Sequence, residues 1–272
     1  MEKFIVANGI ASRYMDSGTD KPAIVLLHGY LESIDIWENL GKKLAPYFRV
    51  LAIDIPGHGV SEIISETHSM ELLADFIESW LKKIGISRCV IAGHSMGGYV
   101  ALAFAKKYPD YVAGIVLIHA SPDPDTPERK ENRIREIEVI KAGRKEMLSR
   151  LNPGKSFAED NKKRFAGVIA EMSEQIMLAE DEGIIALLNG IMEREDMNPV
   201  LQKLNAPELF IFGKKDNFIP VKVAESIIGK NPQAEVAWLE NAGHMGFIEE
   251  EEQCITILRS FTIKAFHKEI TE

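Results

Sequence analysis

Cysteine is scarce in this chain of 272 residues, which has only Cys89 and Cys254. They form no Cys-x-x-Cys pair, so the sequence offers no disulfide framework or redox motif, and we expect both to be core or near-surface thiols. No apolar run approaches the roughly 20 residues that span a bilayer, and the N-terminal residues lack the apolar stretch of a secretory signal. These absences predict a soluble, cytoplasmic protein with no membrane partner.

Positive charge is also in short supply, because the formal net charge is -9. An acidic chain gains nothing from neutralising phosphates, which argues against nucleic acid as a partner. Apolar residues make up 46% of the chain, and its length suits one large α/β domain, or one domain with an insertion, that buries its own core. The partner expected is a small-molecule substrate, and the sequence by itself does not determine an oligomeric state.

Short apolar runs alternate with helical patterns over the first 120 residues. Runs without polar residues suit strands buried on both faces, and strand–helix alternation predicts parallel βαβ units. We therefore expect an α/β fold whose mostly parallel central sheet is flanked by helices. The expected strands are 4–7, 10–15, 23–27, 49–53, 88–92, 112–118, 208–212 and 234–239, and the expected core helices are 36–44, 70–84, 99–108, 221–228 and 249–267.

The alternation stops between Ser121 and Leu204. This segment shows no convincing strand, and 128–151 and 161–197 carry helical spacing with few helix breakers. We expect an all-helical insertion over 121–204, between the two parts of an α/β core at 1–120 and 205–272.

A glycine-flanked serine follows one of the expected strands and precedes a helix. Gly93-His94-Ser95-Met96-Gly97 fits G-x-S-x-G, a motif that places the serine on a sharp strand-to-helix turn. Such a turn presents the hydroxyl at the carboxyl edge of the sheet, where the helix N-terminus adds backbone N–H groups. We predict that Ser95 is a catalytic nucleophile.

A serine hydroxyl needs a general base, and the base needs an orienting carboxylate. Of the seven histidines, His244 follows the last expected strand, which brings it to the same sheet edge as Ser95. Asp216 follows the preceding strand, and the chain order Ser, Asp, His is the one this type of sheet uses. We predict His244 as the base and Asp216 as the acid, with Asp123 and Asp125 as alternatives for the acid.

Acyl transfer also requires donors for a developing oxyanion. The backbone N–H of Met96 supplies one at the helix start, and we expect the N–H of Tyr30 to supply the other. No cofactor is predicted, because the glycine loops lack the G-x-G-x-x-G pattern of a dinucleotide site, and no metal cluster is apparent.

Five segments of the chain resemble the α/β-hydrolase superfamily. They are the run Leu26-Leu27-His28-Gly29-Tyr30, the loop Asp54 to Ser61, the elbow Gly93 to Gly98, Gly213-Lys214-Lys215-Asp216, and Gly243-His244. The resemblance implies the same fold, triad and oxyanion hole, with the insertion as a helical cap over the active site. It is nearest to single-domain carboxylesterases and lyases, and Ser95 stands where haloalkane dehalogenases carry an aspartate.

The leading hypothesis is a serine hydrolase of small carboxylic esters or thioesters that forms an acyl-enzyme. The runner-up is a lyase similar to the α/β-hydrolase-fold enzymes of menaquinone biosynthesis, in which Arg129, Arg133 and Arg135 would hold substrate carboxylates. Many of those enzymes have arginine after the elbow glycines, where this chain has Tyr99. The sequence is also compatible with a C–C bond hydrolase and with a non-enzymatic receptor similar to plant hormone receptors. We expect His28, Tyr99 and Arg129 to line the substrate pocket.

Overall fold

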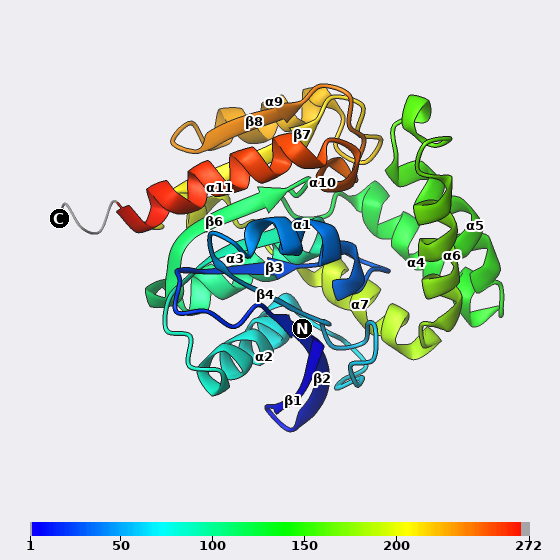
Figure 1. Ribbon diagram of the computed structural model, residues 1–272. Coiled ribbons are helices and arrows are strands. Elements are labelled where there is room, and N and C mark those ends of the chain that lie inside the picture. The colour runs from blue at the N-terminus through cyan, green and yellow to red at the C-terminus, as the bar shows by residue number, and fades with distance from the viewer. Residues whose placement is uncertain (1, 268–272) are drawn as a thin grey trace.

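A single mixed sheet organises the part of the chain, residues 2–267, that this computed structural model describes. The sheet has eight strands in the order β1-β2-β4-β3-β5-β6-β7-β8 (Figure 1). Pairs β1–β2 and β2–β4 are antiparallel, and all other pairs are parallel, which confirms the expected α/β class. The strands are β1 Glu2–Ala7, β2 Ile10–Asp16, β3 Ala23–Leu27, β4 Arg49–Ile53, β5 Cys89–His94, β6 Val112–Ile118, β7 Glu208–Gly213 and β8 Glu235–Leu239.

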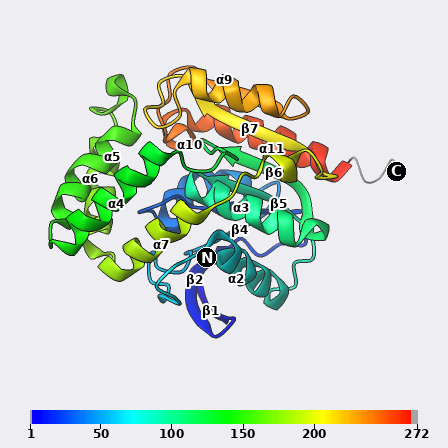
Figure 2. The ribbon, with the colours of Figure 1, turned by 180° about the vertical axis from the view of Figure 1, so that it is seen from behind.

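Helices cover both faces of the sheet, and this explains why its central strands are apolar throughout. Alternate strand residues point to opposite faces, so Val25 and Ile91 pack with α2 and α3, whereas Ile24 and Val90 pack with α1 and α11. Figure 2 shows α2, α3 and α9 on the face that is hidden in Figure 1. The helices of the core are η1 Ile34–Trp37, α1 Glu38–Leu44, α2 Met70–Lys83, α3 Met96–Lys107, η2 Pro109–Tyr111, α9 Val221–Lys230, α10 Gly246–Glu249 and α11 Glu251–His267.

The segment between β6 and β7 is helical, as expected. Its elements are α4 Pro127–Lys141, α5 Lys145–Ser156, η3 Glu159–Asn161, α6 Ala166–Leu178, α7 Asp181–Glu193 and α8 Asn198–Leu201. The pattern over 128–151 forms two helices, because the chain turns at Gly143, whose φ is +70°. Figure 1 shows α4, α5 and α6 together beyond one end of the sheet. The division of the chain into a core and a cap at residues 121 and 204 stays a prediction.

The inserted helices share a small apolar cluster with the loop after β3. Ile137, Ile176, Ile184 and Leu188 pack with Leu31 of that loop. The insertion therefore rests on the segment that includes Tyr30.

Both cysteines are buried, Cys89 on β5 and Cys254 on α11. Burial raises the pKa of each thiol to about 12, so both are protonated at neutral pH and serve as small apolar groups. Among residues 2–267, no helix has the length and apolarity required to cross a bilayer.

Glu208 lies buried at the start of β7, at the sheet edge opposite Ser95. Burial raises the pKa of its carboxyl to about 7, although Gln233 donates a hydrogen bond to it over 2.8 Å. A carboxyl whose pKa is higher in the folded state stabilises the fold fully at low pH, and that contribution is lost as pH rises between about 4.3 and 7.

We expect Glu208→Gln to raise the free energy of unfolding at pH 8.5 by ~1 kcal/mol, because the amide stays neutral, and to change it little at pH 5. Urea unfolding at the two pH values measures the difference. The control is Glu235→Gln, which changes a carboxylate on β8 whose side chain is 46% exposed. An effect of Glu208→Gln that is the same at both pH values would contradict the prediction.

Candidate active site

Ser95 occupies a strained turn between β5 and α3. Its φ of 49° and ψ of -114° lie outside the regions that residues other than glycine ordinarily adopt. The turn is held by two backbone hydrogen bonds of 3.0 Å, from Ser95 N–H to Ile118 and from Gly98 N–H to the Ser95 carbonyl. The Ser95 side chain is partly exposed, and its hydroxyl has no hydrogen-bond partner among the described residues. The hydroxyl can therefore reach a substrate.

The glycines on either side of this turn have no room for a side chain. A Cβ on Gly93 would collide with the backbone of Gly97, and a Cβ on Gly97 would collide with the carbonyl oxygens of Leu27 and His28. Backbone atoms cannot move aside as a flexible side chain can. The G-x-S-x-G spacing is therefore required by close contact of backbone segments.

We expect Gly97→Ala to lower the free energy of unfolding by about 3 kcal/mol, because the added methyl group must displace the chain at the end of β3. Gly154→Ala is the matched control, since Gly154 lies within α5 and its Cβ would meet no atom within 4 Å. Alanine there should be neutral or slightly stabilising. Chemical denaturation of both variants measures the contrast, and equal stability of the two would contradict this account.

Asp216 and His244 follow β7 and β8, and the parallel register brings both loops to the edge where β5 ends at His94. The His244 ring contacts Asp216 Oδ2 through Nδ1 at 2.8 Å. The other carboxylate oxygen accepts backbone N–H groups from Phe218 at 2.7 Å and Ile219 at 3.0 Å. The carboxylate is thus fixed in the orientation that directs the His244 ring.

The environment of Asp216 keeps it ionised. Burial by itself raises the pKa of this carboxyl, but the charge of His244 and the hydrogen bonds from His119 and His244 hold the pKa well below its usual value. An ionised Asp216 only accepts hydrogen bonds, so the His244 Nδ1 carries the proton and the opposite nitrogen, Nε2, is left as the basic atom.

His119 is a second imidazole on the same carboxylate, and sequence reasoning missed it. Its Nδ1 lies 3.1 Å from Asp216 Oδ2, and its Nε2 accepts the Gly246 N–H at 3.2 Å. Burial lowers the pKa of His119 to about 4, so the ring is neutral and donates from Nδ1. One signal was present in the sequence, because His119 directly follows β6 and shares the carboxyl edge of the sheet.

His119, Asp216 and His244 are also, within residues 2–267, the three side chains whose ligand atoms are close enough to hold a metal ion. The proton assignments do not favour that use. The Gly246 N–H makes Nε2 of His119 the acceptor, so the ligating Nδ1 of both rings already carries a proton directed at Asp216. The donor set fits a hydrogen-bonded carboxylate between two imidazoles.

Two backbone N–H groups near Ser95 are free. Within residues 2–267 neither Tyr30 N–H nor Met96 N–H makes an intramolecular hydrogen bond. The neighbours of Tyr30 are bound on both sides, because Gly29 N–H donates to Glu32 over 2.5 Å and Leu31 N–H donates to His58 Nε2 over 2.9 Å. These contacts hold the loop while leaving the Tyr30 N–H unpaired.

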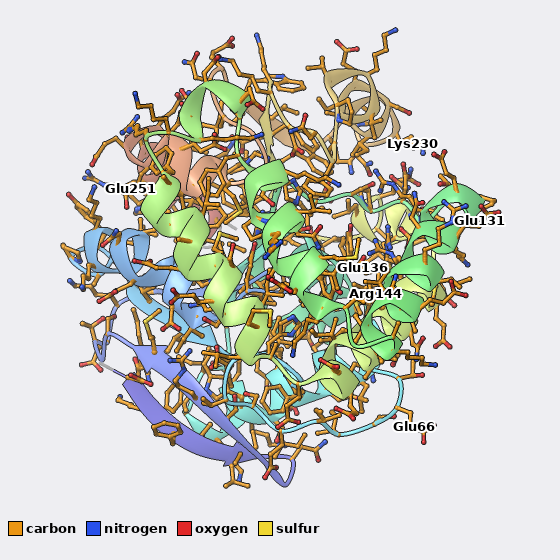
Figure 3. All side chains as sticks on the ribbon, turned by 90° about the vertical axis from the view of Figure 1, so that its right-hand side faces the viewer. Glu66, Glu131, Glu136, Arg144, Lys230 and Glu251 are labelled. Carbon is orange, nitrogen blue, oxygen red and sulfur yellow. The ribbon has the colours of Figure 1, made fainter. Side chains whose placement is uncertain are left out.

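The Tyr30 side chain links this loop to the insertion. Its hydroxyl donates to Glu136 of α4 over 3.0 Å. Figure 3, which faces the inserted helices, labels Glu136 near the middle of this side of the molecule. Burial raises the pKa of the Glu136 carboxyl, although Tyr30 and Arg133 act in the opposite direction.

His28, expected in the substrate pocket, is fully buried in the structure. Its Nε2 accepts the Ile55 N–H at 2.9 Å, and its Nδ1 donates to the Gly29 carbonyl at 2.8 Å. Burial lowers the pKa of His28, so the ring is neutral and both nitrogens are used by backbone groups. His28 thus joins two loops and has no polar atom left for a substrate.

Tyr99 and Arg129, the other two residues expected in the substrate pocket, contact different parts of the chain. Tyr99 is 8% exposed, and the Arg194 guanidinium lies 4.0 Å from the centre of its ring. Arg129 donates to the Phe218 carbonyl over 3.0 Å, and the Phe218 ring contacts His244 at 4.8 Å between ring centres. Arg129 is therefore connected to the site through Phe218.

The remaining arginines and acids considered from the sequence have separate partners. Arg133 and Arg194 both pair with Asp125, and Arg135 is exposed beside Glu131. Asp123 accepts hydrogen bonds from Asn198 and Lys230. Arg129, Arg133 and Arg135 thus have different partners, and within residues 2–267 neither Asp123 nor Asp125 contacts His244.

Comparison with known proteins agrees with this architecture. A family model described as the alpha/beta hydrolase fold matches residues 22–168. The structure is similar to a thermophilic esterase from Thermogutta terrifontis, solved with malate bound, at a TM-score of 0.90 and 30% identity, covering 97% of this chain and 99% of that one.

Two sequence relatives are hydrolases. A 2-hydroxy-6-oxononadienedioate/2-hydroxy-6-oxononatrienedioate hydrolase from Burkholderia vietnamiensis is 28% identical, covering 92% of this chain and 90% of the relative. A pimeloyl-acyl-carrier-protein methyl ester esterase from Photorhabdus laumondii is 26% identical, covering 88% of this chain and 91% of the relative. With the sheet order, the serine turn and the family match in agreement, this chain belongs to the α/β-hydrolase fold family.

Proposed function

We propose that this hydrolase cleaves small carboxylic esters or thioesters through an acyl-enzyme on Ser95. The observation that carries the proposal is the 2.8 Å contact between His244 and a buried, ionised Asp216, at the same sheet edge as the partly exposed Ser95. The Ser95 turn and the free N–H groups of Tyr30 and Met96 support it.

In the proposed mechanism, rotation of the Ser95 hydroxyl brings it to His244 Nε2, a contact that hydrolases often complete only when substrate binds. His244 removes the hydroxyl proton as Ser95 Oγ attacks the carbonyl carbon. Tyr30 and Met96 N–H groups stabilise the oxyanion. His244 then protonates the leaving alcohol or thiol, and the acyl group stays on Ser95. Water, activated by the same ring, releases the acid and restores the hydroxyl.

The insertion at 121–204 is proposed to act as the cap of this site. Its apolar cluster includes Leu31, and its Glu136 accepts the Tyr30 hydroxyl, so it contacts the proposed oxyanion loop at two successive residues. A cap in this place limits the size of the acyl group and excludes water from the reacting carbonyl.

Covalent labelling tests the proposal directly. A fluorophosphonate should add to the peptide that contains Ser95, as read by mass spectrometry, and the labelled protein should lose turnover of p-nitrophenyl acetate and butyrate. The unlabelled protein should turn over both esters. Failure to label Ser95, together with no turnover, would contradict the proposal and favour a binding protein on this fold.

A C–C bond hydrolase is the second candidate. The observation in its favour is the name of the Burkholderia vietnamiensis relative, a 2-hydroxy-6-oxononadienedioate/2-hydroxy-6-oxononatrienedioate hydrolase that aligns with 92% of this chain. A panel of p-nitrophenyl esters, a thioester, a methyl ester of a dicarboxylic acid and a 2-hydroxy-6-oxo dienoate separates the two. The lyase hypothesis has less support from its arginines, because Arg129 binds the Phe218 carbonyl, Arg133 pairs with Asp125 and Arg135 pairs with Glu131.

A further inference from the structure

Glu32 and His94 are buried side chains in contact with each other. Together they adjoin the loop that contains Tyr30, the Ser95 turn and the His244 backbone. Glu32 lies in the loop after β3 and is 7% exposed, and His94 directly precedes Ser95 and is 1% exposed. Glu32 Oε2 accepts the Gly29 N–H at 2.5 Å and lies 3.0 Å from His94 Nδ1. The other nitrogen of His94, Nε2, lies 2.9 Å from the backbone carbonyl oxygen of His244.

The chemistry of these partners assigns the protons. A carbonyl oxygen only accepts hydrogen bonds, so His94 Nε2 must carry a hydrogen. Burial by itself raises the pKa of Glu32, but the charge of His94 and the hydrogen bonds from His94 and Gly29 lower it. An ionised Glu32 also only accepts, so His94 Nδ1 must carry a hydrogen as well. A ring that donates from both nitrogens is an imidazolium.

We propose that Glu32 and His94 are positioning residues whose buried ion pair holds the Tyr30 loop and the His244 backbone in register with Ser95. This inference rests on the proposed function of Ser95. Gly29 N–H, adjacent to Tyr30, binds one end of the pair, and the His244 carbonyl binds the other. The pair thus joins the oxyanion donor to the base, and His94 is covalently next to the nucleophile.

The positive charge on His94 is what allows both contacts. A neutral ring keeps one hydrogen, so it would lose either Glu32 or the His244 carbonyl. Four titratable groups among residues 2–267 face the His94 ring. Glu32 is its hydrogen-bond partner, and the ring centres of His119 and His244 lie 6.1 Å and 4.9 Å from its own ring centre. His28 is close enough for the charge of His94 to lower its pKa. The Phe247 ring, 4.9 Å away, completes an enclosure that keeps water from replacing either contact.

The test is Glu32→Gln, which retains an oxygen for the Gly29 N–H but removes the charge that balances His94. Against p-nitrophenyl butyrate we expect kcat to fall about tenfold, because the hydrogen bond from His94 to this oxygen loses its charge assistance, while KM stays within about twofold. A purely structural defect would lower the amount of folded enzyme and its urea midpoint, whereas the loss of positioning lowers the kcat of the folded enzyme at nearly constant KM.

Two comparisons keep this test specific. Glu208→Gln makes the same change in a buried carboxylate at the opposite sheet edge and should retain wild-type kinetics. Ser95→Ala separates the two proposals: an active Ser95→Ala protein refutes the proposed function. An inactive Ser95→Ala protein, together with wild-type kcat in Glu32→Gln, overturns only the inference about the pair.

A measurement on the wild-type protein covers the case in which Glu32→Gln does not fold. In a ¹⁵N-histidine-labelled sample at pH 7.5, both ring nitrogens of His94 should carry hydrogen-bonded protons, whereas His28 and His119 should carry one each. A His94 ring with one unprotonated nitrogen would overturn the inference.

Discussion

Replacing Ser95 with alanine should lower kcat for p-nitrophenyl butyrate by roughly 10⁴-fold or more, because the proposed acyl-enzyme cannot form without the Ser95 hydroxyl. The change deletes one oxygen that is partly exposed and has no described hydrogen-bond partner. The strained φ of 49° at this position is equally unfavourable for serine and alanine. We therefore expect the variant to fold as the wild type does.

Ser173→Ala is the matched control for this change. Ser173 lies on α6, where its hydroxyl donates to the Ile169 carbonyl over 2.8 Å, away from the Ser95 turn. The control should keep wild-type kcat, and the urea midpoints of all three proteins should agree. A Ser95→Ala protein that retains more than about a tenth of wild-type kcat would show that another group carries the reaction.

The central strands could be predicted because burial on both faces requires a short run of apolar residues. Ala23–Leu27, Arg49–Ile53 and Val112–Ile118 form strands with the expected bounds. Each is covered on both faces, so the strands are nearly all apolar and stand out from the helical segments. The placement of Asp216 and His244 at one edge follows from the same topology, because loops after parallel strands meet there.

The contacts of Glu32 and His94 depend on how distant segments pack, which the spacing of residues in the sequence does not reveal. Glu32 and His94 are 62 residues apart, and His94 and His244 are 150 residues apart. Nothing in the pattern around Glu32 sets it apart from a residue on a polar loop. The contact arises because β3 and β5 are adjacent in the sheet and both chains turn at its carboxyl edge.

His28 shows the opposite difficulty. Its place beside Gly29 and Tyr30 suggested a contact with substrate, yet both of its nitrogens bind backbone groups of Gly29 and Ile55. A buried loop needs partners for its N–H and carbonyl groups, and histidine can supply a donor and an acceptor at once. Which role a loop histidine takes depends on the neighbouring backbone, which becomes visible only in three dimensions.

Asp216→Asn is the second change with a very large expected effect, of about 10⁴-fold in kcat. One carboxylate oxygen accepts the N–H groups of Phe218 and Ile219, so the amide oxygen must occupy that position. The amide NH₂ then faces Nδ1 of His244. To accept from it, the His244 ring must move its proton to Nε2, which is the nitrogen that must take the proton from Ser95.

The neighbouring imidazole reinforces this effect. His119 cannot change its tautomer without directing an Nε2 hydrogen at the Gly246 N–H, so its Nδ1 hydrogen continues to face the position of Asp216 Oδ2. The amide NH₂ therefore opposes at least one imidazole hydrogen, and the stability of the variant should fall along with kcat. Kinetics and urea unfolding on the same samples measure both quantities.

Asp123→Asn is the control, because Asp123 pairs with Lys230 and Asn198 and has no contact with His244. The pH profile supplies a further check. The pKa of Asp216 lies well below its usual value, so the carboxylate stays charged as pH falls through the ordinary carboxyl range. Protonation of Asp216 should therefore not produce the acid limb of wild-type kcat in that range. A kcat for Asp216→Asn within tenfold of the wild-type value would show that His244 does not depend on this carboxylate for its orientation.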